Sequence, residues 1–307
     1  MIIISHKAKQ FLVFSVKLLI VVGAFYFIYN QLVSNNQLDW VSFQNIVVKK
    51  TSIFSVLFLL SFSFINRYLE ILKWQNLVSF IQTISIGEST KQVLGALTAG
   101  IFTPNGLGEY AGKALYYSKL KTKQIIFLNL ICNGIQMILT IIFGTIGLMI
   151  IGYSSWVISI GLLVFSFWLI VFISKKIKIK GYSIIKLVEK INEIPKKVHK
   201  KNLVLAIGRY LVIVHQYYFL FLIFEVHLPY LTMIATIAVV YFLASSLPSF
   251  QFLDFAVKGS VAVFFFGKLN INEWIVVFIT SLFWFLNVVI PIFLGSYFVL
   301  QFKPKWK

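Results

Sequence analysis

Long apolar runs recur along this chain, and they limit what it can fold into more than any other feature. A run of about twenty apolar residues crosses the ~30 Å hydrocarbon core of a bilayer as a single helix. The composition agrees, because 59% of the 307 residues are hydrophobic and 12% are charged, about half the usual charged share. We therefore expect an all-α polytopic membrane protein in which residues 1–307 form a single integral membrane domain.

Two of the apolar segments are interrupted by proline. The first break reads PNGLG at residues 104–108, and the second is Pro248-Ser249. Proline ends a helix because it lacks the backbone N–H, so each segment is predicted to be a broken, re-entrant helix pair. Ordinary surface turns between short interfacial helices are the alternative. The broken pairs cover residues 92–103 with 109–119 and residues 230–247 with 254–267. Six full spans are predicted at residues 11–33, 52–68, 124–151, 156–174, 203–224 and 273–300.

The basic residues are distributed unevenly. The chain has 28 Lys and Arg against nine Asp and Glu, a formal net charge of +19. If each broken pair returns to the side from which it starts, most of the lysines fall on one side, together with both termini. Lys and Arg are enriched in cytoplasmic loops, so the protein is predicted to be a multi-pass protein of the cytoplasmic (inner) membrane with both termini in the cytoplasm. This orientation explains the large positive charge. We therefore expect no nucleic-acid partner, because the chain has no soluble domain that could bind one.

The largest group of lysines lies in one loop. Residues 175–202 combine ten lysines with apolar residues at helical spacing. A basic amphipathic helix of this kind lies on a membrane surface, so this cytoplasmic loop is predicted to contact anionic lipids of the inner leaflet. The alternative is that the lysines serve only to fix the orientation of the chain.

The two halves of the chain share landmarks at a nearly constant separation. Residues 11–151 and 154–300 each hold three full spans and one broken pair, and Arg67 and Arg209 lie 142 positions apart. Three spans and a re-entrant pair make an odd number of crossings, so the second half is inverted relative to the first. Many transporters are built as such inverted repeats.

An acidic residue and a lysine four positions later follow each break. These are Glu109 with Lys113 and, 145 positions further on, Asp254 with Lys258. Broken helices of inverted-repeat transporters meet at the substrate near the bilayer midplane, and ionisable groups at that depth are usually functional. We therefore predict that all four residues bind substrate. The alternative is a pair of capped helices with local ion pairs.

The first break and the segment before it offer further groups for an anionic ligand. Gly106 and Gly108 permit backbone conformations that other residues avoid, and with Asn105 they precede the positive end of a helix dipole. These three residues are predicted to bind substrate. Arg67, in the segment 66–74, is predicted to make the first contact with the phosphate of an inner-leaflet lipid, the alternative being an anchor at the membrane interface.

Signatures of enzymes are absent from the sequence. It has no Walker loop, GxSxG, HExxH or Cys/His metal cluster, and Cys132 is its single cysteine. We therefore expect no catalytic residue, no metal and no cofactor, and a protein that is not an enzyme.

Residues 97–110, which read LTAGIFTPNGLGEY, together with Arg67, Glu70, Lys73 and Trp74 upstream, resemble the lysylphosphatidylglycerol synthase transmembrane-region family, also called the flippase-like domain family. The resemblance covers nearly the whole chain. It implies a protein of the cytoplasmic membrane, and in the best understood branch this region moves aminoacylated phospholipid from the inner to the outer leaflet. We expect a stand-alone member without the aminoacyl-transferase domain. The second break lacks the glycines that many relatives carry there.

These observations predict a translocase for a lipid or a lipid-linked precursor, which moves an anionic or aminoacylated lipid between leaflets. Its binding partner would be a membrane phospholipid or a polyprenyl-linked lipid. The alternative is a non-transporting membrane subunit that partners a lipid-modifying enzyme or a glycosyltransferase.

A topology reporter tests the orientation. A fluorescent protein that matures only in the cytoplasm, fused after Lys307, should be bright, because the basic tail belongs to the cytoplasmic side. Alkaline phosphatase, which is active only in the periplasm, should be inactive at the same position. The opposite pair of results would contradict the predicted orientation.

Overall fold

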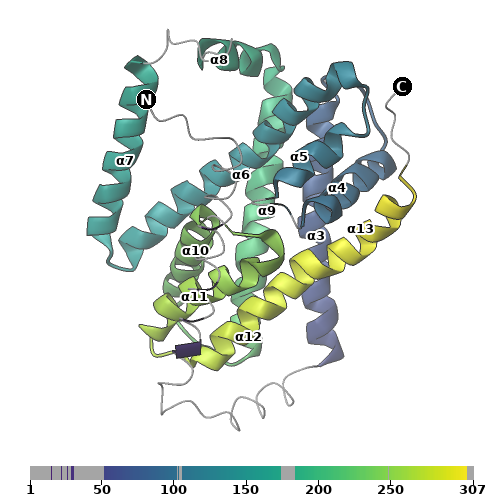
Figure 1. Cartoon of the computed structure of the whole chain (residues 1–307). Coiled ribbons are helices and arrows are strands. Elements are labelled where there is room, and N and C mark those ends of the chain that lie inside the picture. Colours follow the sequence, from purple (N-terminus) through teal and green to yellow (C-terminus); the bar gives the residue numbers. More distant parts are fainter. Residues whose placement is uncertain are drawn as a thin grey trace.

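The computed structural model describes residues 52–101, 103, 106–173, 184–247 and 249–302, together with five isolated positions before residue 52. The described part of the chain is all-helical (Figure 1). The predicted first span at residues 11–33 lies almost wholly outside the described residues, as do Pro104, Asn105 and Pro248.

Four helices are long and apolar enough to cross a membrane by length and composition. They identify the chain as a candidate multi-pass membrane protein and correspond to four of the six predicted full spans. A fifth predicted span corresponds to α7 (Ser154–Ile173), which stands beside the bundle in Figure 1. The four long helices are α3 (Ile53–Val78), α6 (Thr122–Ile150), α9 (Lys196–Ile223) and a final helix. A 3-10 turn at Lys119–Lys121 precedes α6. The final helix consists of α12 (Glu273–Trp284), a π-helical turn (Phe285–Val289) and α13 (Ile290–Leu300).

α3 extends further than the sequence predicts. It ends at Val78 instead of residue 68, because Trp74, Leu77 and Val78 are completely buried. Trp74 and Val78 belong to an apolar cluster with residues of α4 and α6, which stabilises the additional turns. The segment 66–74 therefore lies within α3, and the predicted end of this span at residue 68 is wrong.

The basic region over residues 175–202 also differs from the prediction. α8 (Ile184–Glu193) is a short helix across one end of the bundle (Figure 1), and it corresponds to the predicted amphipathic helix. α9 begins at Lys196, directly after Pro195, which supplies the cap position at which a missing N–H is tolerated. The lysines from Lys196 onward therefore lie on the first turns of a long helix and not in the loop predicted over residues 175–202.

The two broken pairs lie toward opposite ends of the bundle (Figure 1). The first consists of α4 (Ile86–Gly100) and α5 (Leu107–Ala114), and the second of α10 (Tyr230–Ser246), a 3-10 turn (Gln251–Leu253) and α11 (Asp254–Gly267). α4 begins earlier than predicted because Ser85 and Glu88 form a capping box at its start. α11 has the predicted bounds.

Glycine allows the helices of the bundle to approach closely. A Cβ atom on Gly112 of α5 would lie 2.9 Å from the Cα of Ala96 in α4, and one on Gly147 of α6 would lie 2.6 Å from the carbonyl oxygen of Ala235 in α10. Both distances are too short for any residue with a side chain. Small residues at helix crossings are typical of membrane bundles, where tight packing drives association.

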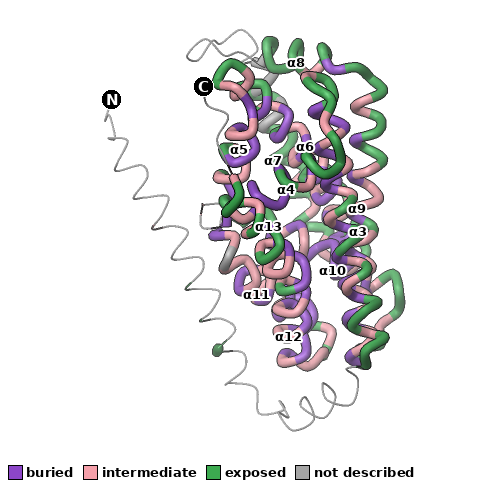
Figure 2. Tube along the Cα trace, turned by 90° about the vertical axis from the view of Figure 1, so that its right-hand side faces the viewer, coloured by how far each residue is buried: buried purple, intermediate pink, exposed green. Residues whose placement is uncertain are grey.

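Buried side chains form two main apolar clusters. The larger gathers residues of α9, α10, α11 and α12, and the smaller gathers residues of α3, α4 and α6 around Trp74. Buried positions follow the inside of the bundle, while exposed positions follow the outer faces of α3, α8 and α9 (Figure 2).

Substitution of Gly147 by alanine tests the close crossing of α6 and α10. The added methyl group must displace backbone, so Gly147→Ala is expected to cost about 1–3 kcal/mol and to lower the melting temperature of the purified protein in detergent. Gly161→Ala on α7 is the matched control, because a Cβ there would meet no atom within 4 Å. Equal melting temperatures for the two variants would contradict the described packing.

Candidate functional site

A cavity of about 450 Å³ lies where the two breaks approach each other. Its wall is formed by residues of α3, α4, α5, α6, α9, α10, α11 and α12 and by the π-helical turn of the final helix. The first break touches the second here, because a Cβ on Gly106, whose φ is +65°, would lie 3.3 Å from Oε1 of Gln251. Both broken pairs therefore contribute to one cavity.

Most of the predicted substrate-binding residues lie on this wall. Lys113 is fully buried behind Glu109, Gly108 packs against Thr103, and Asn105 lies outside the described residues. The predicted residues that line the cavity are Arg67, Gly106, Glu109, Asp254 and Lys258.

The amide groups of the first break are engaged within the break itself. The N–H of Gly108 donates to Oγ1 of Thr103 at 2.7 Å, and the N–H of Glu109 donates to the carbonyl of Gly106 at 2.9 Å. In this conformation these amides are not available to an anion, contrary to the expectation from the sequence. The glycines instead permit close approach, since a Cβ on Gly108 would lie 2.9 Å from the Cα of Gly100.

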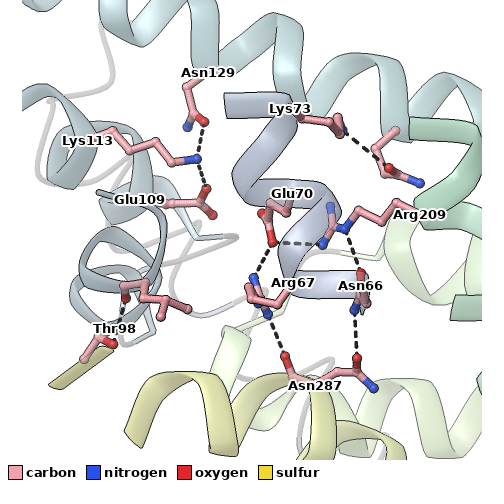
Figure 3. Close-up of polar contacts among 12 residues, drawn as sticks. Asn66, Arg67, Glu70, Lys73, Thr98, Glu109, Lys113, Asn129, Arg209 and Asn287 are labelled. Carbon is pink, nitrogen blue, oxygen red and sulfur yellow. Dashed lines mark hydrogen bonds and ion pairs between the residues drawn. The ribbon is translucent and has the colours of Figure 1, made fainter. Parts of the chain in front are cut away.

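The acid–lysine pair of the first half is deeply buried. Nζ of Lys113 donates to Oε1 of Glu109 at 2.6 Å and to Oδ1 of Asn129 at 2.7 Å (Figure 3). The same ammonium lies 4.7 Å from the centre of the Trp74 ring, within the range of a cation–π interaction. Glu109 thus presents a carboxylate to the cavity while Lys113 balances its charge from behind.

The acid–lysine pair of the second half has a similar arrangement and is more open to solvent. Nζ of Lys258 lies 2.5 Å from Oδ2 of Asp254, and Oγ of Ser249 donates to Oδ1 of the same carboxylate at 3.0 Å. Nζ of Lys258 lies 5.4 Å from the centre of the Tyr241 ring. The second break therefore positions a charged pair at the cavity without the glycines of the first.

Two further residues at the site were not selected from the sequence. Glu70 forms an ion pair with Arg67, and its Oε2 also lies 3.2 Å from Nη2 of Arg209 on α9. All three residues line the cavity. From the sequence, Glu70 belongs only to the motif that resembles the flippase-like family, and Arg209 is only a landmark of the repeat. One signal was available, because Arg67 and Arg209 are the only two arginines in the chain.

A network of buried amides holds the two arginines in place. Nε of Arg209 donates to Oδ1 of Asn66 at 2.8 Å, and Nδ2 of Asn66 donates to Oδ1 of Asn287 at 2.7 Å (Figure 3). Nη2 of Arg67 donates to the backbone carbonyl of Asn287 at 2.7 Å. Pro291 has no N–H for the carbonyl four residues before it, and Arg67 donates to that carbonyl.

Lys73 is a second buried charge near the cavity. It is fully buried, and its Nζ donates to the carbonyl of Cys132 at 2.9 Å, with Oε1 of Gln136 at 3.5 Å. Among the described residues it forms no ion pair with an acid. The surroundings of the cavity therefore carry more positive than negative charge.

Comparisons of the chain with models of known protein families, with curated proteins and with solved structures find no match. The resemblance of residues 97–110 to the flippase-like domain family therefore stays a prediction, which rests on the quoted motifs.

Removal of the Glu109 carboxylate tests the first ion pair. Glu109→Gln is expected to cost about 3–5 kcal/mol of unfolding free energy, because Lys113 is left buried without an acid. The double variant with Lys113→Gln should recover part of that loss in the same denaturation measurement. Glu189→Gln on the exposed face of α8 is the control and should change stability by less than about 0.5 kcal/mol. A Glu109→Gln variant as stable as the control would contradict the described pairing.

Proposed function

We propose that this chain is a flippase-like translocase of the cytoplasmic membrane that moves an anionic or aminoacylated lipid, or a lipid-linked precursor, between leaflets. The observation that carries the proposal is the charged cavity between two broken helix pairs, within a bundle whose helices are long enough to cross a bilayer. A polar head group cannot cross hydrocarbon without such a path, because transfer of a charge into the bilayer centre is costly.

The proposal includes an inverted repeat of residues 11–151 and 154–300, with six full spans and two re-entrant pairs. Three observations support it: the broken pairs lie toward opposite ends of the bundle (Figure 1), both reach the same cavity, and each carries an acid–lysine pair beside its break. In transporters of this plan, one half rocks against the other around a fixed site.

The same proposal assigns α8 to the surface of the inner leaflet. Its exposed residues include Ile185, Leu187 and Val188 with lysines between and beside them. A short helix with this pattern buries its apolar face at the level of the lipid head groups, while its lysines attract anionic lipids. Both termini would then lie in the cytoplasm.

Reconstitution in liposomes tests the function. Fluorescent analogues of lysylphosphatidylglycerol, phosphatidylglycerol and a polyprenyl phosphate are incorporated, and movement between leaflets is followed by chemical bleaching of the outer leaflet. We expect faster movement of at least one analogue in liposomes that contain the protein. Glu109→Gln and Asp254→Asn should each slow that movement by about tenfold or more, which corresponds to a barrier higher by roughly 1.4 kcal/mol.

The comparison uses equal amounts of each variant, taken from monodisperse fractions so that unfolding does not imitate loss of transport. Glu189→Gln removes an exposed carboxylate far from the cavity and should transport like the wild type. Movement of no analogue would favour the non-transporting subunit over the translocase. Movement that is unchanged in both cavity variants would contradict the assignment of the site.

A further inference from the structure

The two arginines of this chain are set apart from its other basic residues. Of the 28 basic residues, two are arginines and the remaining 26 are lysines. Either residue serves to orient a membrane protein, since both carry one positive charge. Arginine differs in its planar group of five donors, which matches carboxylates and phosphates in two-pronged geometry. A chain that uses lysine almost everywhere has placed both of its arginines at one carboxylate.

The geometry brings these arginines together from distant parts of the sequence. Arg67 lies on α3 and Arg209 on α9, and both guanidinium groups contact Oε2 of Glu70. Figure 3 shows the two arginines on either side of Glu70, and all three residues line the cavity. Nε of Arg67 is buried without a hydrogen-bond partner among the described residues. The guanidinium groups thus retain donor capacity that Glu70 does not use.

The charged residues of the cavity wall leave an excess of positive charge at the two arginines. The other two acids on the wall, Glu109 and Asp254, are each paired with the lysine four residues later in their own helix. Glu70 alone faces two arginines, so one positive charge remains unbalanced within the described residues. An anion of one negative charge beside Glu70, or of two negative charges in the place of Glu70, would complete the pairing.

We propose that Arg67 and Arg209 form a binding site for a phosphoryl group, and that Glu70 occupies this site as an internal anion until the ligand displaces it. The chemical class of the ligand is a phosphate monoester or diester on a lipid head group. This inference deepens the proposed function, and it relies on that function only for the lipid source of the phosphate.

The arginines can keep their positions when Glu70 leaves. Arg67 is also held by the backbone carbonyl of Asn287 and Arg209 by the amide of Asn66, and neither bond involves Glu70. Donors fixed in this way need little reorganisation to bind an anion, which favours binding. A triad with a merely structural role would instead bind no ligand and lose stability when Glu70 is changed.

Binding is measured with the purified full chain in an uncharged detergent. The probes are short-chain phosphatidic acid, inorganic phosphate and the matching neutral diacylglycerol, and the readout is the dissociation constant from ligand-induced shifts of the melting temperature. We expect phosphatidic acid to bind and the neutral diacylglycerol to give no shift. If inorganic phosphate binds as tightly as phosphatidic acid, the phosphoryl site is supported and its source is a free anion. If phosphatidic acid binds more tightly, the source is a lipid.

The direction in which a Glu70 substitution changes phosphatidic acid affinity distinguishes a binding site from three residues with a merely structural role. Glu70→Gln removes the competing carboxylate and should tighten phosphatidic acid binding about tenfold, whereas Arg67→Gln and Arg209→Gln should each weaken it about tenfold or more. The arginine variants keep a one-to-one pair with Glu70, so they test the site even if Glu70→Gln does not fold. Lys91→Gln on the exposed face of α4 removes the same charge as a control and should bind like the wild type.

Two results would overturn the inference. The first is a wild-type protein that binds no phosphoryl probe, or whose binding is unchanged in both arginine variants. The second is a folded Glu70→Gln variant that binds phosphatidic acid no more tightly than the wild type. Neither result depends on transport, so binding without lipid movement would contradict only the translocase, and lipid movement without this binding would contradict only the arginine site.

Discussion

A charge in the interior of a membrane bundle is costly unless it is paired or hydrogen-bonded, and the arrangement of this protein depends on that constraint. Hydrocarbon offers no water to a polar group, and an unpaired buried charge costs several kcal/mol. Glu109 and Asp254 meet the constraint locally, with lysines in their own helices. Glu70 meets it across the chain, through Arg209 on α9 as well as Arg67 on α3. That contact ties two long helices together beside the cavity.

Features that follow from local chemistry could be predicted from the sequence. α11 has its predicted bounds because Asp254 begins it after a proline break, and α6 begins within two residues of its predicted start. The acid–lysine pairs were found for the same reason, since residues four positions apart on a helix face each other. The end of α3 was missed because charged residues within 66–74 suggest an interface, and only the burial of Trp74 by other helices keeps that segment helical.

The contact of Glu70 with Arg209 at the cavity could not be predicted from local patterns. Its partner Arg209 lies 139 positions away, and nothing near either residue indicates the contact. The prediction for the glycines of the first break likewise used only the adjacent residues in the sequence. They were expected to expose amides to an anion, yet Gly108 donates its N–H to Thr103 and allows α5 to approach Gly100. The proposed anion site is therefore formed by side chains of α3 and α9, and not by the backbone of the break.

The position of Glu70 also connects ligand binding to movement of the proposed halves. Arg67 and Glu70 lie on α3, whereas Arg209 lies on α9, so a movement of one helix relative to the other would stretch the contact between Arg209 and Glu70. A single carboxylate oxygen can hold both arginines only while they are close. A phosphoryl group presents several oxygens and can bridge two guanidinium groups at a wider separation. On this proposal the ligand has a higher affinity for the separated arrangement, and such a difference in affinity is what a ligand needs to shift a conformational equilibrium. The pairs of Glu109 with Lys113 and Asp254 with Lys258 each lie within one helix, so such a movement would leave both pairs intact.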